Sequence, residues 1–494
     1  MELIPILIVL GLITYFIVKR SVATITRTPI WLFWLVMMAP AFIWSAWLLI
    51  FGGDKPIPIF LVIGPFIIVP FLYWWLIQIG RPTSEAKETA THGTTTTNPE
   101  TEKVAEGTPQ VRPITATEEA TLRNCFPWSI YYLQQIDYRP QAIICRGKLR
   151  SIPEVAYQTI KENVEKAFED RFLLVFQESF QGQPFFALVP NPWTKSQQPA
   201  ETENITRPFF ALALLVITLF TTTVIGVEIS GVSVEQLNSD SSLLLRGLPY
   251  SLGLIVILGI HELSHYLAAI YYKIRATLPY FIPVPFFLGT FGAFIQMRSP
   301  VPHRKALFDV AIAGPLGGFI ITLPILFWGL SLSNIVPIPE NNSILNFEAL
   351  DPRFSFLFAV LGKLALGSKL VTGMAIDLHP LAVAGYIGLI VTALNLMPVG
   401  QLDGGHIVHA MYGQRTAATI GQFTRFAVLL LATIRPDFLL WAILLFLMPI
   451  IDRPALNDVT ELDNKRDFLG LLSLLLLISI LLPLPGAIAG WLNL

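Results

Sequence analysis

Two histidines and a glutamate stand together in the stretch GIHELSH, residues 259–265. Positions i and i+4 of an α-helix share a face, so His261 and His265 can offer two imidazole nitrogens to one metal ion. In an HExxH arrangement the glutamate, here Glu262, is not a ligand and removes a proton from a metal-bound water. The spacing therefore predicts a metal centre that activates water.

The surroundings of this motif strengthen the prediction. An HExxH on a soluble amphipathic helix arises readily by chance, but here it lies in the apolar run 247–272, which has the length of a membrane span. An ionised residue in the middle of a span costs roughly 2.5–3.5 kcal/mol on insertion scales, and such residues usually mark a site. We therefore interpret the motif as a metal site.

A third protein ligand is needed, because catalytic zinc usually has three protein ligands and a water. Our candidate is Asp403, which follows an apolar span in the sequence ALNLMPVGQLDGGHIVHAMYG. The prolines and glycines around it predict a broken helix, which a membrane tolerates beside a buried polar cavity. An aspartate that caps a loop is the alternative, and Glu348 and Glu461 are weaker ligand candidates in loops.

The composition places the chain among membrane proteins. Hydrophobic residues make up 53% and charged residues 14% of it, and its mean hydropathy is +0.61. The net charge of −1 gives no positive field to attract nucleic acid. The two cysteines, Cys125 and Cys145, lack zinc-ligand spacing and are interpreted as ordinary thiols.

The fold class predicted is an all-α polytopic membrane protein with about ten spans. Basic residues after the first span place that loop in the cytoplasm by the positive-inside rule, with the N-terminus outside. The ten candidate spans are 3–18, 30–51, 57–79, 208–228, 247–272, 306–330, 381–398, 416–433, 437–452 and 468–492.

The chain divides into segments of different composition. Residues 81–113 are rich in Thr, Glu and Pro and predict a disordered linker. Residues 114–206 predict a small soluble cytoplasmic βαββ domain for binding or regulation by a partner. The other predicted segments are the N-terminal membrane helices 1–80, a metalloprotease core 207–460 and a C-terminal membrane helix 461–494.

One segment of the core is too rich in proline for a span. Residues 279–298 predict two short strands about the turn Gly289–Gly292, a small re-entrant β-hairpin. Its free edge could hold an unwound peptide as an added strand, with Gly292 and Ala293 as positioning residues. A plain connecting loop is the alternative.

The two motifs together resemble those of the site-2 protease family of intramembrane zinc metalloproteases. HELSH is joined downstream by NLMPVGQLDG, residues 395–404, and the resemblance runs from about 208 to 460. It implies His261, His265 and Asp403 as zinc ligands and Glu262 as the catalytic residue. It also implies that Asn395 orients the substrate or stabilises an oxyanion, although interhelical hydrogen bonding would explain Asn395 nearly as well.

A narrower resemblance concerns the branch found in cyanobacteria and in chloroplasts, the ethylene-dependent gravitropism-deficient and yellow-green proteins. The stretches PYFIPVPFFLGTFGAFIQMRSP, RKALFDVAIAGPLGG and LNDVTE are similar to that branch. Like its members, the sequence shows no PDZ domain. The location it implies is a plasma, thylakoid or chloroplast membrane.

The function expected is a zinc endopeptidase that cuts membrane-spanning segments of protein substrates within the lipid bilayer, without a nucleic acid partner. Water, Zn²⁺ and Glu262 would together attack the scissile carbonyl. A membrane metal or proton transporter is the alternative from another class, but it needs no base beside its ligands and would often show inverted repeats. An inactive protease-like scaffold is the other alternative.

Overall fold

The computed structural model describes residues 28–51, 114–139, 142–179, 182–192, 207–286, 288–339, 346–434 and 436–494, with short stretches between 11 and 76. The chain forms two compact units, residues 1–106 and 107–494. The first contains helix α2 (Ile30–Phe51). The predicted linker 81–113 lies outside the described residues, as do most of the predicted spans 3–18 and 57–79.

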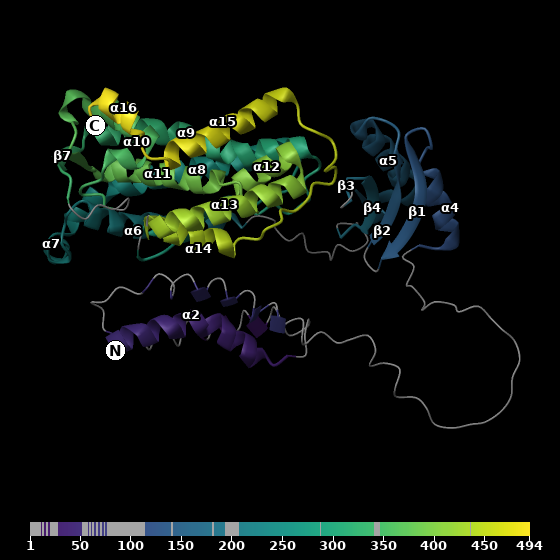
Figure 1. Ribbon diagram of the computed structural model, residues 1–494, viewed down its shortest axis with the longest axis horizontal. Helices are drawn as coiled ribbons and strands as arrows, with labels where there is room; N and C mark the ends of the chain where they lie inside the picture. Colours follow the sequence, from purple (N-terminus) through teal and green to yellow (C-terminus); the bar gives the residue numbers. More distant parts are fainter. Residues whose placement is uncertain are drawn as a thin grey trace, which may run out of the picture. The chain divides into compact units, whose positions relative to one another are not determined.

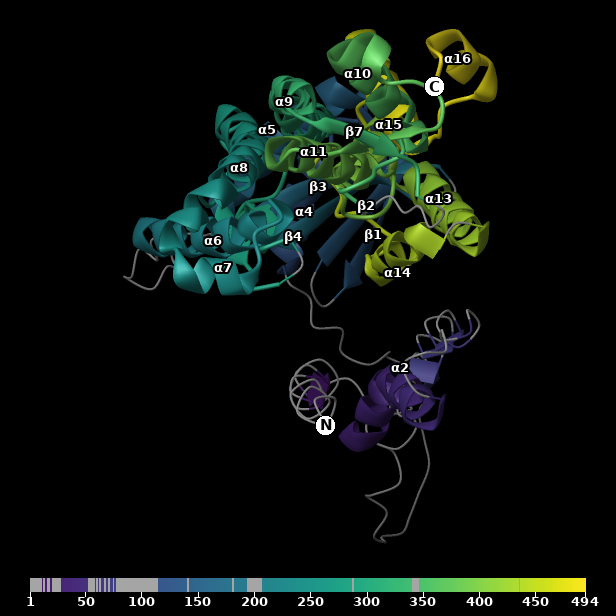
Figure 2. The ribbon, with the colours of Figure 1, turned by 90° about the vertical axis from the view of Figure 1, so that its left-hand side faces the viewer.

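The second unit contains a helical core (Figure 1). Its long helices are α6 (Pro208–Ile229), α8 (Leu248–Tyr271), α9 (Arg304–Ser331), α11 (Pro380–Leu396), α13 (Gln414–Ile434) and α15 (Asn464–Leu481). Viewed end-on in Figure 2, α11 lies between α8 and α9 on one side and α15 on the other. The shorter helices are α7 (Val234–Ser239), α10 (Phe356–Leu366), α12 (Asp403–Tyr412), α14 (Leu439–Leu447) and α16 (Gly486–Leu492).

Five described helices are long and apolar enough to cross a membrane, or six if α15 and α16 form one broken span. The chain is thus a multi-pass membrane protein, but the prediction of ten spans is not confirmed. The predicted span 437–452 is wrong, because α14 has nine residues and prolines flank it. The predicted span 468–492 is bent by 74° where Pro483 and Pro485 interrupt it.

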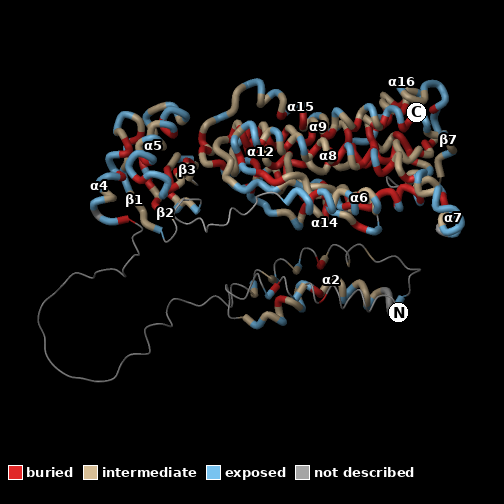
Figure 3. Tube along the Cα trace, turned by 180° about the vertical axis from the view of Figure 1, so that it is seen from behind, coloured by how far each residue is buried: buried red, intermediate tan, exposed pale blue. Residues whose placement is uncertain are grey.

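Small residues let the central helices approach one another. A Cβ added at Gly329 of α9 would lie 2.3 Å from the backbone nitrogen of Ala382 in α11. One added at Gly385 of α11 would lie 2.7 Å from the Cα of Leu326 in α9. Such close backbone contact is typical of membrane helix pairs, which pack through small residues. Buried residues gather along these inner helices (Figure 3).

The hairpin predicted at 279–298 is present. Strands β5 (Tyr280–Pro283) and β6 (Thr290–Phe294) pair in antiparallel fashion. Gly289 in its turn and Gly292 in β6 adopt positive φ, +80° and +98°, which glycine tolerates best. The hydroxyl of Thr221 in α6 donates to the Gly289 carbonyl at 2.7 Å, so the turn is fixed to a core helix.

A second, smaller sheet lies in the loops between helices. Strands β7 (Asn334–Pro337) and β8 (Met374–Asp377) pair in antiparallel fashion. They join the residues that follow α9 to those that precede α11, and so close one end of the core.

Residues 114–192, called the α/β unit below, form a four-stranded antiparallel sheet of order β1-β2-β4-β3. The predicted βαββ pattern missed its first strand and its first helix. Cys125 and Cys145 are free and buried in its core, and burial raises the pKa of Cys145 to about 12. The elements are α4 (Ala116–Asn124), β1 (Tyr131–Arg139), β2 (Ala142–Leu149), α5 (Pro153–Phe168), β3 (Phe172–Glu178) and β4 (Pro184–Pro190).

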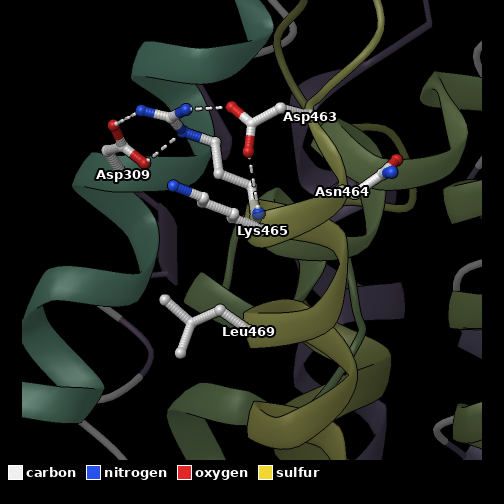
Figure 4. Close-up of a pocket in the computed structure, with 6 residues that line it drawn as sticks. Asp309, Asp463, Asn464, Lys465 and Leu469 are labelled. Carbon is white, nitrogen blue, oxygen red and sulfur yellow. Dashed lines mark hydrogen bonds and ion pairs between the residues drawn. The ribbon is translucent and has the colours of Figure 1, made fainter.

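An ion pair fixes the last long helix to the core. Asp309 of α9 accepts hydrogen bonds from Arg466 of α15 at 2.6 and 2.7 Å. Asp463 contacts the same guanidinium from the other side, and Figure 4 shows the two carboxylates on its opposite flanks. The Tyr272 hydroxyl also donates to Asp309. Four residues from three segments thus join the ends of α8, α9 and α15.

Successive contacts place the α/β unit at the C-terminal end of α8. The rings of Tyr272 and His303 pack there, and His303 and Phe176 of β3 both bridge to Asn457. Leu245 lies at the other end, about 36 Å away for a 24-residue helix.

We predict that cysteines introduced at Glu165 and Leu245, both exposed, are labelled from opposite sides of the membrane. Cys125 and Cys145 should contribute little labelling of their own, because both are buried. The measurement is reaction with an impermeant maleimide in sealed vesicles of known orientation. Labelling of both positions from one side would contradict this arrangement.

Candidate metal centre

The motif residues of α8 meet a second segment where α11 ends. Asn395 lies in the last turn of α11, and Asp403 begins α12. Between the two helices Gly400 has a positive φ of +54°. A Cβ at Gly404 would lie 1.9 Å from the Leu396 carbonyl oxygen, so this position admits only glycine without movement. The predicted broken helix is confirmed, and it turns Asp403 toward α8.

Three donor atoms converge there. His261 Nε2 and His265 Nε2 lie 3.3 Å apart. Asp403 Oδ2 lies 3.3 Å from His265 Nε2 and 3.5 Å from His261 Nε2. Ligand atoms of a tetrahedral ion with bonds of about 2.0–2.1 Å are separated by about 3.3 Å. The three atoms are therefore spaced as on one face of a tetrahedron of the size that zinc adopts.

The hydrogen bonds of the rings fit the same chemistry. His265 Nδ1 lies 2.7 Å from the Val310 carbonyl oxygen and donates to it, so Nε2 retains its lone pair. That lone pair faces the other histidine and a carboxylate, and both rings are buried. Electron-rich atoms held together in this way repel one another unless a cation lies between them. The donor set fits a metal ion.

Glycines of α9 make room for the two rings. A Cβ at Gly314 would lie 2.0 Å from His265 Nε2, and one at Gly318 would lie 3.1 Å from His261. At Gly317 the nearest atom would be the Ser264 hydroxyl, at 2.1 Å. These three glycines, with Val310 one turn earlier, form the wall of α9 against which the histidines rest.

A cavity of about 280 Å³ opens beside the donor atoms. Glu262 and Asn395 line it together with Gln401. The Asn395 amide nitrogen lies 3.1 Å from His261 Nε2, so the amide reaches the centre of the site. Asn395 was expected either to orient the substrate or stabilise an oxyanion, or to form an interhelical hydrogen bond. This position is compatible with both roles.

The β-hairpin forms another wall of the cavity. Ala293, Phe294 and Ile295 line it, and the backbone N–H of Ile295 interacts with the Glu262 carboxylate. Gly292, a predicted positioning residue, is not among the described residues that line the cavity; it lies in β6 with a positive φ, where the pairing with β5 is irregular. The structure thus brings the HExxH residues, Asp403, Asn395 and Ala293 to one place.

The structure also shows residues that the sequence did not single out. Val310 contributes only a backbone carbonyl, and no side-chain pattern could mark it. Gln401 could have been identified from the sequence, because it lies two positions before Asp403. The alternative ligands Glu348 and Glu461 are not part of any group of metal-binding side chains among the described residues.

Comparison with known proteins agrees with this geometry. The family model described as "Peptidase family M50" matches residues 249–432, which include both motifs. The match thus assigns the part of the chain that carries both motifs to a peptidase M50 domain, the domain of the site-2 protease family.

Proteins similar to this chain occur in plants. The chain is 31% identical over 370 residues to a probable zinc metalloprotease, chloroplastic, of Arabidopsis thaliana named EGY2. That alignment covers 74% of the chain and 64% of the relative. It is 34% identical over 244 residues to the Arabidopsis EGY1 protein, covering 49% of the chain and 44% of the relative.

The rice EGY3 protein is 26% identical over 381 residues, which cover 74% of the chain and 64% of the relative. The chain thus spans less than two thirds of the length of these curated relatives. No solved structure matches it.

We predict that Gly314→Ala lowers the affinity for a divalent metal by about tenfold or more, because the new methyl group displaces the His265 ring. Alanine favours a helix over glycine, so a weakened helix cannot explain the loss. Metal content after dialysis against a chelator measures the effect. Gly486→Ala is the control, since a Cβ there meets open space. Unchanged metal retention by Gly314→Ala would contradict the geometry.

Proposed function

We propose that this protein is an intramembrane zinc endopeptidase that cleaves membrane-embedded segments of other proteins. The observation that carries the proposal is the triangle of His261, His265 and Asp403 donor atoms beside a carboxylate that is not one of them. The names of its relatives, zinc metalloproteases, support zinc as the ion. A transporter would not need the adjacent base Glu262.

Each residue of the site has a separate part in the proposed reaction. Zinc held by the three ligands would supply Lewis acidity to a water molecule and to the scissile carbonyl. Glu262 accepts the proton that this water loses and returns it to the leaving amine nitrogen. Asn395 donates an amide hydrogen to the carbonyl oxygen as negative charge develops there. His265 keeps its orientation through the Val310 carbonyl.

The substrate class follows from the free edge of β6. Gln296 directs its N–H and C=O toward Thr277 on the β5 side of the ladder. Because successive residues of an extended chain point their backbone groups to alternate sides, the N–H and C=O groups of Ala293 and Ile295 point to the opposite edge. The Ile295 N–H interacts with Glu262 from that edge. An unwound substrate paired along it would place its backbone beside the zinc ligands and Glu262.

Water and product need a path through the membrane domain. His261 lies ten residues before the C-terminal end of α8, about 15 Å along the helix. The cavity provides a polar lining at this depth. The relatives are named chloroplastic, which favours a thylakoid or chloroplast membrane as the place of action.

We predict that Glu262→Gln lowers cleavage by about 10²–10⁴-fold while zinc stays bound, because the amide cannot accept the proton. The protein should then retain uncleaved single-pass proteins, which mass spectrometry of the purified variant would identify. Glu235→Gln, on an exposed helix outside the core, is the matched control. Wild-type cleavage by Glu262→Gln would refute the assigned base.

A second prediction concerns the edge of β6. Ala293→Pro removes an N–H from the free edge and should lower cleavage by about tenfold or more without loss of zinc. Ala293→Val, which keeps the N–H, is the control. Ile295→Val should be nearly silent, whereas Ile295→Pro would also disturb Glu262 and is less informative. Cleavage of a membrane substrate by Ala293→Pro at the wild-type rate would show that substrate is held elsewhere.

A further inference from the structure

A second cluster of titratable side chains lies at the other end of α12. His409 is fully buried, and each of its ring nitrogens faces a carboxylate. Nδ1 lies 2.7 Å from Asp452 Oδ2, and Nε2 lies 3.0 and 3.1 Å from the two oxygens of Asp458. A neutral imidazole has one N–H and would turn a lone pair toward one of these carboxylates. His409 is therefore an imidazolium that donates to both.

The ionisation of the cluster agrees with this geometry. Burial lowers the pKa of His409, but the hydrogen bonds and charges of Asp452 and Asp458 outweigh it and raise the pKa to about 9. Burial raises the pKa of Asp452, and its two histidine partners lower it to about 2. His406, which lines the metal cavity, also lies 2.8 Å from Asp452. Arg304 of α9 faces the same cluster, since its charge interacts with Asp458 and also with Glu178, Glu461 and Asp467.

Both carboxylates come from the loop between α14 and α15, and this loop also holds the α/β unit. The Phe176 N–H of β3 donates to the Leu456 carbonyl at 2.7 Å, and the Asp458 N–H donates to the Phe176 carbonyl at 2.9 Å. Leu456 and Asn457 donate to the backbone of Val301 and Pro302, just before α9. The loop is thus bonded to the α/β unit on one side and to the core on the other.

Side chains strengthen this contact between the loop and the α/β unit, called the joint below. Val459 is buried in the hydrophobic core of the α/β unit, and Leu456 packs against that core. Asp458, which bonds to His409, lies between them in the chain. A movement of the α/β unit therefore moves a carboxylate that holds α12.

Helix α12 connects His409 to Asp403, so a movement of the α/β unit would reach this ligand through the helix. Asp403 and His409 are six residues apart on one ten-residue helix, about 9 Å along its axis. Arg304 Nε also donates to the Ala410 carbonyl at 2.7 Å, so one cation from α9 contacts the C-terminal end of α12 beside His409. A ligand set that works within about 0.5 Å is sensitive to a small tilt of such a helix.

We propose that His409, held between Asp452 and Asp458, is the positioning residue through which the α/β unit sets the orientation of Asp403 toward the two histidines. The inference rests on the metal site of the proposed function and adds a regulatory input to it. A partner that shifts the α/β unit would change the affinity for zinc, and with it the rate of cleavage, without entering the cavity.

Three variants of the full-length protein in detergent test the proposal. His409→Gln and Asp458→Asn remove the charge pair, and Val459→Ser weakens the joint without touching α12. The zinc dissociation constant is measured by competition with a chelator, and cleavage is measured at limiting and at saturating zinc. Glu461→Gln is the control, an exposed carboxylate of the same loop. Protection of the buried Cys145 thiol reports whether the α/β unit stays folded.

We expect each of the three variants to raise the zinc dissociation constant by about tenfold or more, as loss of a ligand-orienting contact does. Saturating zinc should restore most of the cleavage, which a collapsed site would not allow, and Cys145 should stay protected. Wild-type zinc affinity in His409→Gln would overturn the positioning role. Wild-type affinity in Val459→Ser would overturn the link to the α/β unit. A wild-type protein that bound no zinc would instead overturn the proposed function.

Discussion

The structure depends on holding three electron-rich atoms at 3.3–3.5 Å from one another inside a membrane protein. Two imidazole nitrogens and a carboxylate oxygen at that separation repel one another in a medium of low polarity, and a cation relieves the repulsion. The fold must supply the confinement. Helix α8 provides one face with both rings, the glycines of α9 let the rings approach, and the break after α11 turns Asp403 toward them. Each contribution is local, but the site exists only where all three meet.

The same confinement explains why polar backbone occurs beside the site. Irregular chain at membrane depth is tolerated where it is buried in protein or lines a cavity, and both the segment 397–402 and the β-hairpin meet this condition. The hairpin adds a strand edge that faces Glu262. In the proposed function, this edge offers a place for an extended substrate backbone beside the metal-binding face, and hydrolysis of a peptide bond would need both. Helix α12 extends the arrangement outward to the joint with the α/β unit.

The sequence predicted the parts of this arrangement that depend on local patterns. The apolar run 247–272 closely matches α8, and the i, i+4 spacing alone paired His261 with His265. The proline and glycines around Asp403 predicted the break. Strand β1 was missed because a β-bulge between Leu133 and Gln135 interrupts the alternation that marks a strand.

The contacts that tune the site could not be predicted in this way. Val310 acts through its carbonyl, 45 positions from His265, and Asp452 lies 43 positions from His409. No periodicity carries information over such separations. The predicted span 437–452 is wrong and the predicted span 468–492 is bent, because hydropathy counts apolar residues and takes no account of the prolines that flank α14 and separate α15 from α16.

The central claim is that one zinc ion is held jointly by two histidines of α8 and the aspartate of α12. X-ray absorption at the zinc edge, with metal analysis of the same purified sample, measures this directly. The account predicts one zinc per chain in a four-coordinate shell of two imidazoles and lighter oxygen ligands, and loss of that zinc in Asp403→Ala. Full zinc occupancy with an unchanged shell in Asp403→Ala would contradict it.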